Sequence, residues 1–156
     1  MPNRSSSFRR LLMTSCLLLA SLCSREVATS HAQGAPSQEQ TTRAAINRFH
    51  EAFNRHDANA LAETLTEDTL FEDTSPVPDG RRIEGKAAVV DFWRGWFAHN
   101  ADARFETEQM IIGGNHATVL WTYRKMRDGR PWHLRGVDVF TVRNGKVAAK
   151  LAYVKG

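Results

Sequence analysis

Cysteine is almost absent from this chain, because its two cysteines, Cys16 and Cys23, both lie within the first 32 residues. The remainder cannot rely on disulfides and must be held together by an apolar core. The same scarcity excludes a thiol nucleophile and cysteine metal ligands there. No histidine pair has the H-x-x-x-H or H-E-x-x-H spacing, and no G-x-G-x-x-G, P-loop or G-x-S-x-G motif occurs. The sequence therefore predicts neither a metal nor a cofactor.

An excess of one charge is also missing once the N-terminal segment is set aside. The whole chain has 21 basic and 17 acidic residues, but four of the arginines and one glutamate fall within residues 1–32. The other 17 basic and 16 acidic residues nearly balance. Since nonspecific nucleic-acid binding needs a basic surface, we expect no nucleic-acid partner.

Residues 1–32 have the three parts of a secretory signal peptide, in the usual order. Arginines precede the apolar run Leu11–Cys23, and small residues follow it. The run is shorter than the roughly 20 residues of a membrane-spanning helix. We expect cleavage after Ala32, or secondarily after Ser30, and a periplasmic or secreted protein with no stable membrane association. An uncleaved anchor is the alternative.

The polar stretch 33–40 contains glycine and proline and predicts a flexible lead-in to one domain, 41–156. Periodic apolar residues predict helices over 41–54 and 85–99, and Asp57 predicts the cap of a short helix running through Leu61 to Leu65. Alternating segments and Asp-Gly and Asn-Gly turn signals predict five strands. These are residues 69–73, 104–112, 116–127, 132–143 and 146–154. The order predicts an α+β fold, with a curved antiparallel sheet wrapped on three helices and a pocket at its open end.

Asp138 is a carboxylate among apolar residues. In the strand 132–143 its side chain shares a face with Leu134, Gly136, Phe140 and Val142. If that face meets the helices, burial should raise the pKa of Asp138, and a neutral carboxyl can donate a hydrogen bond to a developing oxyanion. Two alternatives stay open: a buried structural aspartate held by a partner, and reversed faces that leave it in solvent.

Asp73 ends the strand 69–73 and is followed by a loop rich in proline and glycine. A carboxylate at a strand end beside a pocket can act as a general base. An aspartate that accepts backbone N–H groups within a turn is the other interpretation. Likewise, the aromatic stripe around Trp93 predicts hydrophobic core, or a cavity wall with an indole N–H directed inward.

Two segments together carry a family resemblance. TEDTLFEDTSPVPDGRRIEGKAAVVDFW and HLRGVDVFTVRNGKVAAKLAYV resemble the nuclear-transport-factor-2-like superfamily, and within it the SnoaL-like and ketosteroid-isomerase-like proteins. The resemblance covers about residues 44–154. It implies a cone-shaped α+β fold with a pocket at its wide end.

The resemblance also implies roles for residues. Asp73 matches the base that moves a proton next to a carbonyl, and Asp138 matches the protonated half of the oxyanion hole, a system that is itself a standard example of a carboxyl kept neutral. The tyrosine of that oxyanion hole is replaced by Phe49, and a supporting tyrosine by Trp93. The expected substrate-binding residues are aromatic: Phe49, Phe71, Phe92, Trp93, Trp121, Tyr123 and Phe140.

Three functions follow as hypotheses. The first is a cofactor-free isomerase or cyclase acting on an apolar carbonyl compound such as a steroid, polyketide or terpenoid. The second is a binding or scavenging module with the same pocket and no turnover. The third is an interaction domain that forms a homodimer through the outer sheet face, which carries His133, Arg135, Val137 and Val139, and this is compatible with the other two.

Overall fold

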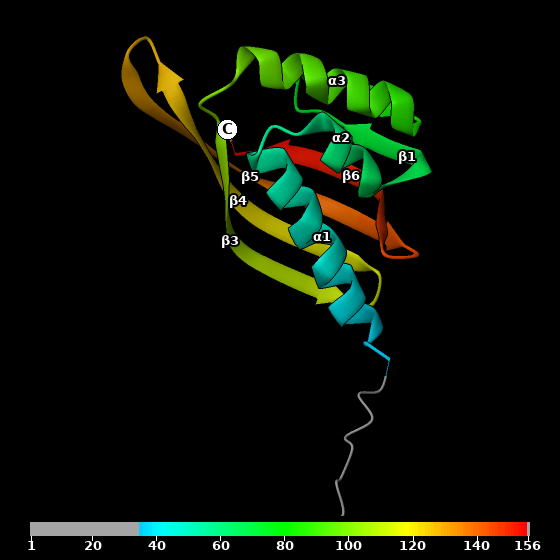
Figure 1. Cartoon of the computed structure of the whole chain (residues 1–156). Coiled ribbons are helices and arrows are strands. Elements are labelled where there is room, and N and C mark those ends of the chain that lie inside the picture. Colours follow the sequence, from blue (N-terminus) through cyan, green and yellow to red (C-terminus); the bar gives the residue numbers. More distant parts are fainter. Residues whose placement is uncertain (1–34, 156) are drawn as a thin grey trace, which may run out of the picture. The chain divides into compact units, whose positions relative to one another are not determined.

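The computed structural model describes residues 35–155, so the expected signal peptide and its cleavage sites lie outside the described residues. Three helices pack on one six-stranded sheet within this range (Figure 1). The helices are α1 (Gln38–Asn54), α2 (Ala58–Glu63) and α3 (Lys86–His99). The strands are β1 (Leu65–Glu72), β2 (Arg82–Glu84), β3 (Arg104–Gly113), β4 (His116–Arg127), β5 (Arg130–Arg143) and β6 (Lys146–Val154). The α+β prediction is confirmed.

Helix α1 begins three residues earlier than expected, so residues 38–40 are not part of a flexible lead-in. Ser37 and Gln40 form a capping box, in which the Ser37 hydroxyl accepts the Gln40 N–H at 3.2 Å and Gln40 Oε1 accepts the Ser37 N–H at 2.8 Å. Such reciprocal bonds satisfy two of the free N–H groups at a helix start. Thr42, in the second turn of the helix, is buried and its hydroxyl donates to the Gly114 carbonyl at 2.9 Å.

Helix α2 is capped as expected, because Asp57 Oδ1 accepts the N–H groups of Asn59 and Ala60 at 3.1 and 2.9 Å. The helix ends at Glu63, two residues before the expected end. Leu65 already belongs to β1, which is therefore four residues longer at its start than the sequence indicated. Helix and strand propensities locate the ends of elements poorly, because pairing with other strands decides where a strand begins.

The sheet order is β2-β1-β6-β5-β4-β3. The strands from β3 to β6 pair as antiparallel neighbours, and the Asp128-Gly129 and Asn144-Gly145 turns have the positive φ values that tight hairpins need. The sheet is antiparallel, as expected, except at one place, where β1 pairs with β6 in parallel. Strand β2 lies in the segment expected to be all loop, where it pairs with β1.

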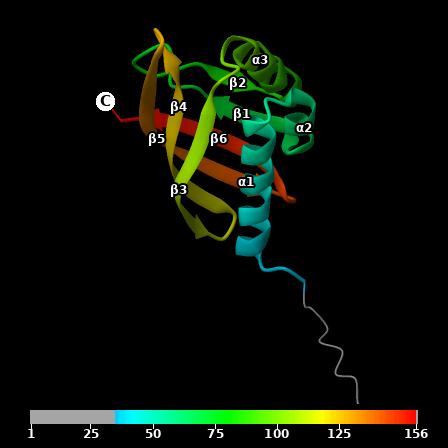
Figure 2. The same ribbon diagram turned by 60° about the vertical axis from the view of Figure 1, so that its left-hand side comes forward.

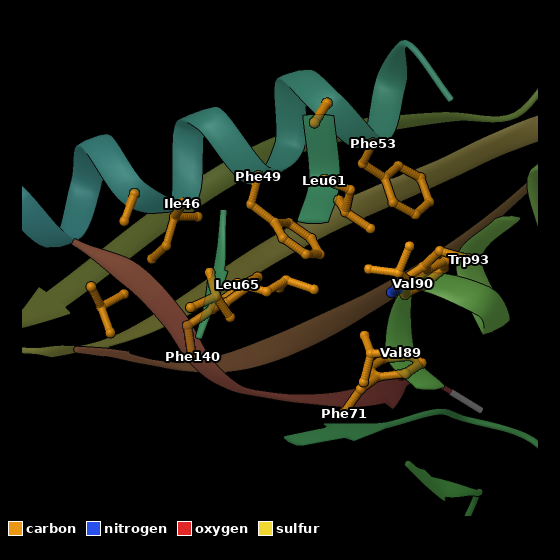
Figure 3. Packing of buried hydrophobic residues seen from close by; sticks show 14 of the residues in the cluster. Ile46, Phe49, Phe53, Leu61, Leu65, Phe71, Val89, Val90, Trp93 and Phe140 are labelled. Atoms are coloured by element: carbon orange, nitrogen blue, oxygen red, sulfur yellow. The ribbon is translucent and has the colours of Figure 1, made fainter. Parts of the chain in front are cut away.

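One face of the sheet carries the core. Helix α1 lies across β3, β5 and β6, whereas α3 lies against β1 and β2 (Figures 1 and 2). Phe49 and Phe53 point from α1 into the layer between helices and sheet, where Phe140 and Trp93 meet them from β5 and α3 (Figure 3). Full burial of each such side chain contributes about 1.5–3 kcal/mol. Residues 35–155 include no helix that is long and apolar enough to cross a membrane.

Candidate functional site

A cavity of about 350 Å³ opens between α3 and the sheet. Helix α1 contributes no side chain to its wall, because α1 covers the other part of the sheet face. The β4–β5 hairpin extends past its neighbours toward the end of α3 and forms one side of the opening (Figure 1). The lining includes Phe71, Asp73, Trp93, Trp96, Asn100, Trp121, Tyr123, Lys125, Arg127, Trp132, Asp138 and Lys150.

Asp138 lies in the floor of this cavity with an exposed fraction of 0%. The parity prediction is confirmed, since Phe140 and Val142 on the same face are also buried. The carboxylate is not isolated, however. Lys150 Nζ lies 2.9 Å from Asp138 Oδ1, and the Lys150 side chain is only 7% exposed. Of the alternatives for Asp138, a buried aspartate held by a partner describes the geometry, and the partner is Lys150.

Burial raises the pKa of Asp138, while the charge of Lys150 and the nearby Trp121 indole oppose that rise. A buried ion pair loses the hydration of both members, and its mutual attraction only partly compensates for that loss. The floor of the cavity therefore holds a buried ammonium–carboxylate pair whose members lie 2.9 Å apart.

The sequence did not reveal Lys150 because strict alternation on β6 places it on the face opposite Val147. The pairing of β5 with β6 shifts between Thr141 and Val142, which pair with Ala149 and Val147. Ala148 is thus the extra residue of a bulge, and a bulge reverses the facing of residues beyond it. As a result Val147 and Lys150 are both buried. A lysine flanked by the apolar residues Ala149 and Leu151 in a strand was the one available signal.

Two indole nitrogens in this region lack a hydrogen-bond partner among residues 35–155, as does Asp138 Oδ2. Trp93 Nε1 and Trp121 Nε1 are buried, and neither forms a hydrogen bond with the described residues. The Trp121 ring fits because position 136 is glycine, where a β-carbon would lie 2.3 Å from Trp121 Cζ2. Buried unpartnered N–H groups in a cavity wall are donors available to a ligand or to water. The expectation of a cavity-lining tryptophan in the stripe of the helix 85–99 agrees with the placement of Trp93.

Asp73 reaches the cavity from the residue after β1. Its carboxylate Oδ1 accepts the Thr74 N–H at 2.8 Å, and its backbone N–H donates to the Arg81 carbonyl at 2.9 Å. Gly80, with φ of 77°, packs so closely that a β-carbon there would lie 1.8 Å from the Asp73 carbonyl oxygen. The proline-rich loop thus fixes the backbone of Asp73. Half-buried and with one oxygen free of hydrogen bonds to the described residues, Asp73 can take a proton from a ligand.

The structure brings most of the predicted site residues together. Asp73, Asp138, Phe71, Trp93, Trp121 and Tyr123 line the same cavity. Three of the expected wall residues do not. Phe49 and Phe140 are 2% and 0% exposed and pack on each other in the core, with ring centroids 5.7 Å apart. Phe92 lies on the flank of α3 against Phe71 and under the Arg81 guanidinium.

The opening of the cavity is polar and basic. Asn100 Oδ1 accepts bonds from Lys125 Nζ at 3.0 Å and from the Tyr123 hydroxyl at 3.3 Å. Arg127 lies over the Trp132 ring at 5.5 Å. Burial raises the pKa of Tyr123 to about 12, so the hydroxyl keeps its proton. Because Asn100 occupies that hydroxyl, Tyr123 does not replace the missing oxyanion tyrosine in the floor.

Metal chemistry has no ready donor set in the described part of the chain. Residues 35–155 contain no group of three or more histidine, cysteine or carboxylate side chains placed to hold an ion. The arrangement instead offers a free carboxylate on one wall, a buried ammonium–carboxylate pair in the floor, and two indole donors.

Comparison with known proteins agrees with this architecture. The model of the SnoaL-like domain family matches residues 46–150. An NTF2-like protein of unknown function from Mesorhizobium loti is 34% identical, with a TM-score of 0.67 over 78% of this chain and 97% of that one. A proposed polyketide cyclase from Sinorhizobium meliloti is 24% identical, with a TM-score of 0.58 over 69% and 92%.

A proposed ketosteroid isomerase from Kribbella flavida is 20% identical, with a TM-score of 0.64 over 78% of this chain and 83% of that one. At this identity the likeness supports the fold alone. No curated protein matches the chain.

Proposed function

This chain belongs to the SnoaL-like domain family, and we propose that it is a cofactor-free enzyme that moves a proton on a carbon next to the carbonyl of an apolar small molecule. The observation that carries the proposal is one cavity lined by both Asp73 and the buried Lys150–Asp138 pair. A base and an electrophilic site on one ligand are the minimum for this reaction.

In the proposed reaction Asp73 removes a proton from the carbon beside the carbonyl. The electron pair of the broken C–H bond forms a carbon–carbon double bond, and the carbonyl π electrons move to oxygen. The Lys150 ammonium and the indole N–H groups stabilise that oxyanion, while Asp138 holds Lys150 in place. Asp73 then returns the proton to another carbon of the conjugated system. Removing one oxyanion donor typically lowers the rate by about 10²–10³.

This assignment changes the expected role of Asp138. The family resemblance implies a neutral carboxyl that donates directly to the oxyanion. In this chain Lys150 is the donor to the oxyanion. Asp138 positions Lys150 and does not contact the oxyanion itself. A cationic donor compensates for the tyrosine that Phe49 replaces, because hydrogen bonds from charged groups are about twice as strong as neutral ones.

The cavity favours a small substrate. Its volume of about 350 Å³ lies near the lower end of the range for ligand sites, which is about 300–1,000 Å³. Aromatic walls favour an apolar body, and the donors in the floor favour one carbonyl oxygen. Double-bond migration is the simplest outcome, and ring closure follows if an electrophile lies beside the enolate. Both outcomes are compatible with the fold, since structures that share it are described as a proposed polyketide cyclase and a proposed ketosteroid isomerase.

The proposal is tested by ultraviolet detection of double-bond migration in cyclohex-3-enone and in a β,γ-unsaturated 3-ketosteroid. We expect turnover of the smaller ketone, lost in Asp73→Asn and unchanged in Asp79→Asn, which alters an exposed aspartate of the same loop. Equal rates for wild type, both variants and buffer would contradict the proposal that the protein is an enzyme for this reaction.

A binding module without turnover is the second candidate. The observation that favours it is the ion pair in the floor of the cavity. Asp138 is paired with Lys150 there and is not a free acid that could donate to a substrate. In that case Asp73→Asn leaves ligand affinity unchanged and no substrate is converted. Isothermal titration beside the ultraviolet assay separates the two candidates.

We also propose export and dimerisation. The signal-peptide pattern of residues 1–32 supports a periplasmic or secreted protein, which N-terminal sequencing of the exported form tests. The outer sheet face carries exposed His133 and Arg135 beside half-buried Val137 and Val139, and 54% of Tyr153 is exposed. These residues support a homodimer through that face. Light scattering that gives a monomer mass contradicts it.

A further inference from the structure

The Lys150 amine lies in unusually dry surroundings. The residue is 6% exposed, and its Nζ lies 5.1 Å from the Phe71 ring centroid and 5.9 Å from those of Trp93 and Phe140. These rings stabilise a positive charge through their faces. Lys150 and its partner Asp138 are both part of the lining of the cavity. A lysine that only stabilised the fold would not need to line a cavity, so its position there indicates contact with a ligand.

The hydrogen-bonding capacity of the ammonium does not match its surroundings. An ammonium has three N–H donors. Among the described residues, Asp138 is the one acidic partner of Lys150, through Oδ1 at 2.9 Å. A protonated imine at the same nitrogen has a single N–H and is also a cation. It would keep the Asp138 contact and the ring faces with a single N–H to satisfy, so the site accommodates the iminium.

We propose that Lys150 forms a Schiff base with the carbonyl carbon of an aldehyde or ketone bound in the cavity. The proposal rests on the proposed function only in that the ligand is a carbonyl compound. It assigns a covalent role to a residue that would otherwise stabilise an oxyanion.

Formation of the Schiff base releases one water and leaves the positive charge on the nitrogen. The Lys150 ammonium transfers a proton to the Asp138 carboxylate 2.9 Å away, which leaves an amine lone pair. That lone pair forms a bond to the carbonyl carbon, the C=O π pair moves to oxygen, and the oxygen takes the proton from Asp138. Asp138 next accepts an N–H proton and delivers it to the carbinol hydroxyl, which leaves as water. The nitrogen lone pair then forms the C=N bond, giving a cationic iminium beside the Asp138 carboxylate.

The chemistry of Asp138 suits this relay. Burial raises its pKa, so the carboxyl can hold a proton transiently. The resulting iminium withdraws electrons from the adjacent C–H bond, from which Asp73 can remove the proton to give an enamine. Schiff-base lysines commonly lie in desolvated, apolar pockets, and Lys150 has such surroundings.

Reductive trapping tests the proposal directly. The wild-type protein is incubated with cyclohexanone and cyanoborohydride at neutral pH, and labelled lysines are mapped by peptide mass spectrometry. The chain has five lysines, at positions 86, 125, 146, 150 and 155, so each site is resolved. We expect Lys150 to gain one cyclohexyl group about tenfold or more faster than exposed Lys155. Labelling of Lys150 no faster than Lys155 in the folded protein overturns the proposal.

Variants separate reactivity from access. Asp138→Asn should slow labelling of Lys150 without changing that of Lys125, which also lines the cavity but bonds to Asn100. Equal slowing at both lysines contradicts the relay. Turnover in the ultraviolet assay without trapping leaves the proposed function intact and overturns the Schiff base. Trapping without turnover supports the Schiff base and contradicts the isomerase. The comparison of Lys150 with Lys155 uses the wild-type protein alone, so it tests the proposal even if a variant does not fold.

Discussion

Lys150 and Asp138 meet diagonally across β5 and β6, with Nζ and Oδ1 2.9 Å apart at the floor of the cavity. Their backbones are not opposite each other, since Asp138 pairs with Ala152 and Lys150 with Phe140. Diagonal neighbours on a sheet are within reach of long side chains. The bulge at Ala148 gives Lys150 this facing, so a backbone irregularity places the cation of the site.

Breaking the pair should destabilise the protein strongly. Lys150→Met leaves the Asp138 carboxylate buried without a partner, which typically costs about 3–5 kcal/mol. Lys155→Met, at an exposed position, is the matched control. The double variant Lys150→Met/Asp138→Leu should recover most of the loss, because apolar residues of similar volume replace a buried pair at little cost. Urea unfolding checks this, and additive losses in the double variant would contradict the pairing.

The stability of the protein should depend on His50 between pH 4 and 6.5. Burial, and then the charge of Lys150, lowers the pKa of His50 to about 4 from 6.5. The unfolded chain binds the proton more readily in this window, so stability is lost as pH falls through it. The difference corresponds to about 3 kcal/mol.

His50→Phe isolates this effect, since Nε2 of His50 is buried without a partner. The loss of unfolding free energy between pH 7 and pH 5 should be smaller in the variant than in the wild type. Asp138 has a raised pKa, so its contribution to stability is lost as pH rises, opposite to that of His50. This contribution is the same in wild type and variant, and it cancels in the difference between their unfolding free energies. His133→Phe, at an exposed site, should leave the pH dependence intact. An unchanged dependence in His50→Phe would contradict a neutral His50.

Gly80→Ala should impair Asp73 more than it impairs folding. The added β-carbon meets the Asp73 carbonyl at 1.8 Å, so the backbone of the base must move. Gly129→Ala is the control, because its φ is 72° but nothing lies within 4 Å of the new atom. Both should lose about 1–2 kcal/mol from the positive φ, measured by thermal unfolding. Only Gly80→Ala should lose turnover, and equal activities would show that the loop does not position Asp73.

Gly136→Ala should displace Trp121 from the cavity wall. The new β-carbon would lie 2.2 Å from the Tyr153 carbonyl oxygen and 2.3 Å from Trp121 Cζ2. We expect a change in tryptophan fluorescence and at least about tenfold weaker binding of cyclohexanone, since an indole donor and a wall move together. Gly113→Ala, which meets nothing within 4 Å, should do neither. Unaltered fluorescence in Gly136→Ala would contradict the packing.

Much of the fold could be predicted from the sequence because its signals are local. The Asp-Gly and Asn-Gly turns specified two hairpins, and the alternation in β5 placed Asp138 on the inner face. Strand β2 and the parallel pairing of β1 with β6 could not be predicted, because both depend on which segments meet in space.

The candidate site was predictable in part for the same reason. Parity and the family resemblance brought Asp73 and Asp138 to one cavity. Phe49 was misplaced because the apolar face of α1 serves the core and does not reach the cavity wall. Lys150 was missed because a bulge reverses the facing of a strand without leaving a mark in its sequence.

The most direct measurement of the central claim is exchange of the α-hydrogens of cyclohexanone into deuterated buffer, followed by nuclear magnetic resonance. It detects proton removal itself, whatever the natural substrate is. The account predicts exchange that wild type and Asp79→Asn accelerate equally and that Asp73→Asn loses by about 10²-fold or more. Exchange at the buffer rate with all three proteins, under conditions where cyclohexanone is bound, would contradict it.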